Sequence, residues 1–276
     1  MRLNGQSMSS KISPTQERLR EVGLRQPQAE AFAFADELHD ITYEWHTHSY
    51  HQLLYSFSGL TKLETPSRLW LLPPQRAAWI PAGLRHRTTL HRVTSGSIYF
   101  LPDRFAFAGL EQIAVFTATP LLREMIAFGM RWTNQPRGPE PLADHFFQTV
   151  ALYCGELAQT ELPYSLPQGS SKCVCAAITY TVTHLEAVTL PEVCQAAAIS
   201  TRSLRRHFLA ETGLTWRQFL TRARLLRALE LLTEGQSNVT ETAYACGFSN
   251  LSAFSEAFQI FTGENPAAFR RNRLRR

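Results

Sequence analysis

The sequence predicts an α+β protein with an N-terminal β-barrel followed by an all-α domain. Short apolar runs rich in β-branched and aromatic residues recur from about residue 41 to 119, and Pro and Gly punctuate them. This pattern is typical of a barrel or sandwich. From about residue 120 onward, apolar residues recur at helical spacing instead. The length of 276 residues is enough for two domains that each bury a core.

The N-terminal half divides into an arm and a domain. Residues 1–30 are polar and aperiodic, which indicates a flexible N-terminal arm. Residues 31–161 form the first domain, which includes the barrel strands and two helices at about 120–160. We expect Asp144 to cap the second of these helices.

A linker and a helical domain follow. Residues 162–172 include two prolines and a Gly-Ser pair, which favours a linker. Residues 173–276 hold the remaining helices, with helix-turn-helix units at about 190–210 and 239–261. A long amphipathic helix, ended by Gly235, is expected between the two units.

The net charge of +5 lies entirely in the C-terminal third. Residues 170–276 contain 13 Lys and Arg against 8 Asp and Glu, whereas the preceding 169 residues contain 15 of each sign. This surplus indicates a segment that faces a polyanion, although a solvated basic surface without a partner has the same composition.

The composition also indicates where in the cell the protein is located. No apolar run approaches the roughly 18 residues that span a bilayer, and the first residues lack the apolar region of a secretory signal. Five cysteines without regular spacing suit a reducing cytoplasm. We therefore expect a cytoplasmic protein with no membrane partner.

The first helix-turn-helix unit is predicted from residues 190–213. Ser200 stands where an N-cap belongs, and the helix after it projects Arg202, Arg205 and Arg206 outward. Guanidinium groups suit guanine edges or phosphate oxygens in the major groove. The inward positions on the two helices of this unit are Leu190, Val193, Ala197, Leu204 and Phe208.

The second unit, residues 239–263, has different chemistry. Gly247 allows its tight turn, and the outward positions of its second helix include no Lys or Arg. Its base contacts should be hydroxyl, apolar or carboxylate-to-cytosine, with a smaller share of the affinity. The inward positions are Ala243, Tyr244, Phe254, Phe258 and Phe261.

The second unit also carries a family signature. From Gly247 to Arg270 the sequence follows G-F-x3-S-x-F-x3-F-x4-G-x2-P-x2-F-R, which resembles the AraC/XylS family of bacterial transcription regulators. The resemblance covers about residues 173–272, with Ala198 in place of the glycine usual in the first turn.

This resemblance implies a sequence-specific DNA-binding regulator and not an enzyme. Its partners would be double-stranded promoter or operator DNA, RNA polymerase and a second copy of the chain. The implied DNA-reading residues are Arg202, Ser203, Arg205, Arg206, Leu251, Ser252, Ser255 and Glu256.

The barrel carries a second resemblance. His46, His48 and Gln52 follow the first cupin motif, H-x-H-x3-E-x6-G, with Gln in the Glu position. His86 fits the second motif, P-x-G-x2-H-x3-N, in which Leu90 takes the last ligand place. The resemblance implies a cupin-like sensor domain in which these three histidines and Gln52 hold a divalent metal (Zn, Ni, Fe or Cu). A metal-free pocket for a small molecule and a merely structural core are the alternatives.

Two other functions compete with a regulator. A cupin-type metal-dependent enzyme fused to a DNA-binding module is one, and Gln52 and Leu90 argue against it because both replace ligands. A nonspecific architectural DNA-binding protein is the other, but it would not need two recognition helices with different outward chemistry. A redox or metal switch at Cys173 and Cys175 is disfavoured, because residues two apart on a helix do not face each other.

Overall fold

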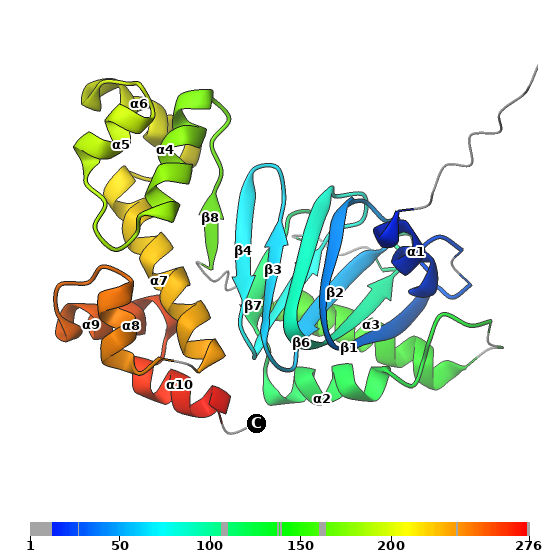
Figure 1. Ribbon diagram of the computed structural model, residues 1–276. Helices are drawn as coiled ribbons and strands as arrows, with labels where there is room; N and C mark the ends of the chain where they lie inside the picture. The colour runs from blue at the N-terminus through cyan, green and yellow to red at the C-terminus, as the bar shows by residue number, and fades with distance from the viewer. Residues whose placement is uncertain are drawn as a thin grey trace, which may run out of the picture.

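The computed structural model describes residues 13–26, 28–105, 110–136, 138, 140–159, 164–235 and 237–274. An antiparallel β domain comes first and a helical domain lies beside it, so the predicted α+β order is confirmed (Figure 1). Among the described helices, none has the length and apolar character needed to cross a membrane.

One antiparallel sheet of eight strands forms the β domain. The strand order is β7-β5-β2-β6-β3-β4-β8, and β1 pairs with β6. The long strand β6 pairs with β1 along its length, with β2 through its second half and with β3 through its first half. Because one strand pairs with three others, the sheet curls into the barrel seen in Figure 1. The strands are β1 (Ala31–His46), β2 (His51–Ser56), β3 (Leu60–Glu64), β4 (Arg68–Leu72), β5 (Arg76–Ile80), β6 (His86–Phe100), β7 (Ala114–Thr117) and β8 (Ser165–Pro167).

The barrel begins earlier than the apolar runs suggest. Strand β1 starts at Ala31, ten residues before the expected start of the strands. Ala31 and Ala33 enter one apolar cluster and Phe32 enters another, so both faces of the strand are covered. A strand buried on both faces lacks the polar-apolar alternation by which a half-buried strand is recognised.

A helix lies within the segment expected to be a flexible arm. Helix α1 (Pro14–Glu21) is capped by Ser13, and its Leu19 is buried against the barrel. Residues 13–26 are thus ordered against the barrel, whereas residues 1–12 lie outside the described part of the chain. The arm prediction is wrong for residues 13–26, because Leu19 finds an apolar surface that is distant in sequence.

Two helices complete the N-terminal domain. Helices α2 (Pro120–Gly129) and α3 (Pro141–Leu157) lie under the barrel in Figure 1. They bury Ile126 and Phe147 in the apolar cluster that also contains Ala31 and Ala33. Helix α3 begins at Pro141, so Asp144 stands in its first turn and is not its cap.

The segment expected to be a linker is tied to the barrel. Strand β8 pairs with β4, so residues 165–167 of this segment form an edge strand of the sheet. Ser171 then caps α4, and its hydroxyl accepts from the backbone N–H of Val174.

The helical domain and the barrel share one apolar cluster. Tyr164, just before β8, contacts Phe261 of the second unit with ring centroids 5.3 Å apart. The inward positions predicted for both units are buried or partly buried, apart from Tyr244, which is 53% exposed. The helices are α4 (Lys172–Thr183), α5 (Leu190–Ala196), α6 (Thr201–Thr212), α7 (Trp216–Glu234), α8 (Val239–Ala245), α9 (Leu251–Thr262) and α10 (Pro266–Leu274).

Candidate DNA-reading face and histidine cluster

The first unit, α5 and α6, has the tight turn that the pattern predicts. Ala198 holds a left-handed conformation with φ of 50°. Such a conformation costs a residue with a Cβ about 1–2 kcal/mol, which explains why glycine is usual there. Ser200 then caps α6 and accepts from the backbone N–H of Ser203 at 3.2 Å.

The first two turns of α6, after this cap, present arginine side chains to solvent. Arg202, Arg205 and Arg206 are exposed, and Phe208 is buried on the opposite face. Neither Arg202 nor Arg205 has an ion-pair partner within the described residues. Ser203 is half-buried, and its hydroxyl accepts from that of Ser200.

The second unit, α8 and α9, turns at Gly247, whose φ is 80°. A Cβ at this position would lie 2.5 Å from the carbonyl oxygen of Glu186, so the close approach also requires glycine. Asn250 caps α9 by accepting from the backbone N–H of Ala253 at 2.7 Å. The candidate readers of α9 are exposed or half-buried: Leu251, Ser252, Ser255 and Glu256.

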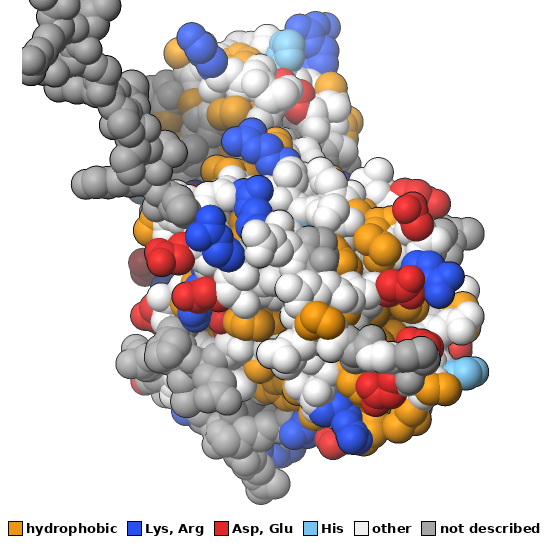
Figure 2. All heavy atoms as spheres, turned by 90° about the vertical axis from the view of Figure 1, so that its right-hand side faces the viewer, with side chains coloured by type: hydrophobic (Ala, Val, Ile, Leu, Met, Phe, Trp, Pro, Cys, Tyr) orange, Lys and Arg blue, Asp and Glu red, His pale blue; other side chains and the backbone are white. Residues whose placement is uncertain are grey.

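On the face shown in Figure 2, the described residues of the barrel form no row of like charges comparable to the exposed arginines of α6. Figure 2 shows the face that looks away from the helical domain, where Lys and Arg side chains are interspersed with Asp and Glu. Among its described residues, this face therefore presents no extended surface of one sign that would attract a polyanion.

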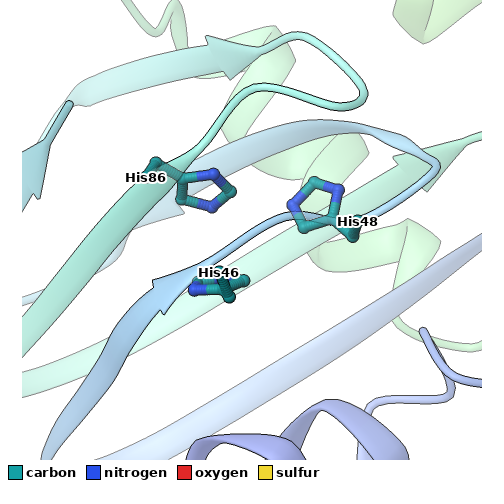
Figure 3. A group of neighbouring side chains, drawn as sticks. All are labelled: His46, His48 and His86. Atoms are coloured by element: carbon teal, nitrogen blue, oxygen red, sulfur yellow. The ribbon is translucent and has the colours of Figure 1, made fainter. Parts of the chain in front are cut away.

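The second group of candidate residues lies inside the barrel. His46 ends β1, His86 begins β6, and His48 lies in the connection from β1 to β2. The three rings point toward one another (Figure 3), and one nitrogen from each lies within 4.8 Å of the others. Ring centroids are 4.3 Å apart for His46 and His86 and 5.0 Å apart for His48 and His86.

Backbone carbonyls define the protonation of these rings. Nδ1 of His46, His48 and His86 lies 2.7, 2.7 and 2.9 Å from the carbonyl oxygens of residues 44, 50 and 84. A carbonyl can only accept, so each Nδ1 carries the proton and each Nε2 keeps a lone pair. Burial lowers the pKa of His46, brings that of His48 to about 4 and lowers that of His86 well below its ordinary value. All three rings are therefore neutral at pH 7.

Gln52 joins this cluster. Its Oε1 lies 3.1 Å from Nε2 of His48, and its amide nitrogen donates to Ser97 Oγ at 2.9 Å. His46, Gln52 and His86 help to line a cavity of about 20 Å³. Nε2 of His86 finds no hydrogen-bond partner among the described residues, although His86 is only 1% exposed.

A carboxylate borders the same cavity. Asp36 accepts from the hydroxyl of Tyr43 at 2.8 Å and from Arg18 of α1 at 3.3 Å. Burial is the main reason that the pKa of Tyr43 lies above its ordinary value. The helix that covers the barrel is thus anchored beside the histidine cluster.

The cysteines form no disulfide; all five are free. Burial raises the pKa of the Cys246 thiol to about 12. Cys154, Cys194 and Cys246 are buried, in agreement with a role as small apolar core residues.

Two solved structures show similarity at low TM-scores. The structure of ToxT from Vibrio cholerae covers 87% of this chain and 97% of its own, at 11% identity and a TM-score of 0.37. The DNA-binding domain of AdpA, solved with a target DNA, covers 39% of this chain and 97% of its own, at 31% identity and a TM-score of 0.36.

The sequence comparisons concern both the whole chain and its C-terminal part. The HTH-type transcriptional regulator NimR of Escherichia coli (strain K12) is 27% identical over 250 residues, or 87% of each chain. The HTH-type transcriptional activator RhaS of Yersinia pestis (strain Pestoides F) is 38% identical over 85 residues, or 31% of each chain. Residues 193–272, which span the second unit and all but the first three residues of the first, match the family described as a helix-turn-helix domain. With the AraC signature in the second unit, these matches show that the chain carries an AraC-type helix-turn-helix domain and that its relatives are helix-turn-helix transcription regulators.

Proposed function

We propose that this regulator recognises a specific promoter or operator sequence through α6 and α9, and that its barrel senses an effector that modulates this binding. The observation that carries the proposal is the row of exposed arginines, Arg202, Arg205 and Arg206, on a capped helix of a helix-turn-helix domain. Arginine forks bind guanine O6 and N7 through two parallel hydrogen bonds, which makes such a row suited to base reading.

Helices α6 and α9 would make different kinds of contact with DNA. Helix α6 supplies positive charge, with Ser203 near its capped end as a further contact. Helix α9 offers Leu251, Ser252, Ser255 and Glu256, which suit thymine methyl groups, polar base edges and the cytosine amino group. Because α9 offers no cation at these positions, α6 should carry more of the salt-dependent affinity.

The first test replaces Arg205 by Ala after an operator has been selected from a random DNA library. We expect a loss of about 1–3 kcal/mol in discrimination between operator and random DNA. Arg217→Ala is the matched control, because Arg217 is exposed at the start of α7, outside the candidate readers. Equal losses on operator and random DNA would make Arg205 a phosphate contact and contradict base reading.

We also infer a homodimer, in which helices α2 and α3 contribute to the contact. Both helices expose large apolar side chains, which are Leu121, Phe128, Leu142 and Leu152. Sedimentation of the full chain tests this inference: Leu142→Lys with Leu152→Lys should produce monomers without loss of helix content. A monomeric parent chain would contradict it.

The remaining partners follow from the same function. A cytoplasmic regulator would meet RNA polymerase at the promoter, and its barrel would bind an effector without turning it over. The effector, a metal ion or a small molecule, can change DNA binding only if its affinity differs between two arrangements of barrel and helical domain.

A further inference from the structure

A second pocket of the barrel, of about 500 Å³, lies beside the turn between β3 and β4 and shares no described lining residue with the histidine cavity. We propose that it binds a small organic carboxylate, with the carboxylate on Arg68 and the apolar part of the molecule against Trp70, Leu84 and Ile113. This names the site and the chemical class of the effector, and the regulatory role rests on the function proposed above.

The size of the pocket suits a small organic molecule. Pockets for such ligands measure roughly 300–1,000 Å³, whereas the histidine cavity, at about 20 Å³, has room for one water-sized species. The lining comes from β4 on one side and from residues just before β7 on the other. These two strands lie near opposite ends of the strand order, and no ladder joins them among the described residues. The sheet therefore leaves space for a ligand at this place.

The charge of the lining favours an anion. Arg68 is the charged residue of the described lining, and in the described part of the chain its guanidinium has no carboxylate partner. Its Nη1 makes a long hydrogen bond to Ser165 Oγ, at 3.5 Å. The neighbouring carboxylate, Glu64, is already paired with Arg87 at 2.9 Å and with Lys62 at 3.5 Å. A ligand carboxylate can therefore accept charge-assisted hydrogen bonds from Arg68.

The apolar part of the lining includes a hydrogen-bond donor without a partner. Trp70 is 5% exposed, and its Nε1 finds no acceptor among the described residues. An indole N–H can only donate, and a buried donor without an acceptor is destabilising. A ligand oxygen that accepts from Trp70 removes this cost. The pocket thus favours a molecule that carries oxygen over a pure hydrocarbon, while Leu84 and Ile113 favour an apolar body.

The pocket adjoins the connection to the helical domain. Strand β8 pairs with β4 and lies between the barrel and the helical domain (Figure 1). A bound carboxylate would compete with the Ser165 hydroxyl of β8 for Arg68. The residue before Ser165 is Tyr164, which contacts the Phe261 ring and donates to the Thr262 carbonyl at 3.4 Å. A ligand on Arg68 therefore acts next to the residue that holds the end of α9.

The experiment titrates the full chain calorimetrically with hexanoate and 3-phenylpropanoate, and with the neutral amide of each acid. We expect saturable binding of a carboxylate at one site per chain. The matching amide should bind at least about tenfold more weakly, because it forms no charge-assisted hydrogen bond with Arg68.

Two variants locate the site. Arg68→Met should weaken carboxylate binding by about tenfold or more and abolish the preference over the amide. Gln112→Glu places a negative charge in the lining at an exposed position, so it should weaken binding of the carboxylate and spare the amide without risk to folding. Arg85→Met is the matched control: Arg85 is exposed beside Leu84, but it lies over the Trp45 ring and outside the lining.

Several results would overturn the site. A folded parent chain that bound neither carboxylate would do so, as would amides that bound as tightly as the acids. Parent-like binding by the Arg68→Met and Gln112→Glu variants would place the ligand elsewhere and would also overturn it.

Operator affinity is then measured with and without the bound carboxylate. A change that occurs in the parent chain and is lost in Arg68→Met supports the effector role. An unchanged affinity would overturn that role and leave the site intact, whereas absence of any operator binding in both conditions would refute the proposed function itself.

Discussion

Arg76 connects the barrel to the second helix-turn-helix unit, and replacing it with Met should loosen that connection. The side chain is 3% exposed at the start of β5. Its Nη2 donates to the Tyr164 hydroxyl at 3.0 Å and to the carbonyl oxygen of Thr262, the last residue of α9, at 3.5 Å. The guanidinium carbon also lies 5.2 Å from the centre of the Tyr164 ring.

The magnitude follows from these contacts. A hydrogen bond from a charged group contributes about 1.5–3 kcal/mol, and a buried cation–π contact adds about 1–2 kcal/mol. Against this, Nε of Arg76 finds no partner in the described part of the chain, and removing that buried group returns about 1–3 kcal/mol. Met fills much of the same volume, so we expect a net loss of about 1–3 kcal/mol.

Hydrogen exchange is the assay, because a two-domain chain need not unfold in one step. Protection at the end of α9 and at the start of α10 should fall about 5- to 150-fold if the loss is local, while α5 and α6 remain unchanged. Arg87→Met is the matched control, since Arg87 pairs with Glu64 inside the barrel at 2.9 Å. If protection in α9 stayed unchanged, or if the control had an equal effect, the Arg76 hydrogen bonds would not hold α9 against the barrel.

Three further predictions concern the helical domain. Gly247→Ala should destabilise it by about 2–4 kcal/mol, because the added Cβ meets the Glu186 carbonyl in a left-handed turn; urea unfolding with a midpoint like the parent's would contradict this. Ala198→Gly should stabilise the first unit by about 0.5–1 kcal/mol by removing left-handed strain, and a lower melting temperature would count against it. Burial raises the pKa of Glu211, but hydrogen bonds from two serines at the start of α4 outweigh it and bring the pKa to about 2. A lowered folded-state pKa adds stability above the ordinary value near 4.5 that is lost as pH falls toward 2, so Glu211→Gln should flatten that acid dependence in unfolding curves at about pH 2–6.

Local patterns were sufficient for the two helix-turn-helix units. Phe254 and Phe258 recur at helical spacing, and Ser200 and Gly247 mark a cap and a left-handed turn that local sequence predicts, although the Glu186 carbonyl against Gly247 comes from a segment distant in sequence. Tyr244 was the exception, because its exposure depends on which side of the short helix α8 has neighbours.

The histidine cluster was predicted from spacing, but its geometry was not. The motif places His46 and His48 two residues apart, but β1 ends at His46 and His48 lies beyond it, in the connection to β2. The Nδ1 contacts depend on carbonyls whose direction no motif encodes. No local pattern indicated α1 against the barrel or Arg76 at the helical domain either, since both depend on surfaces distant in sequence.

These long-range contacts place the two candidate sites on one physical path. Gln52 of β2 pairs with Ile80 at one end of β5, and Arg76 stands at the other end, about 13 Å away at roughly 3.3 Å per residue. An effector that displaced Gln52 would therefore act on β5, the strand whose far end contacts the last residue of α9 through Arg76. A rigid strand transmits such a pull only if its ends have two stable arrangements. The Arg76 hydrogen bond to the Thr262 carbonyl is long, at 3.5 Å, and a small displacement would break it, so binding of an effector in the barrel should alter the C-terminal end of α9 first.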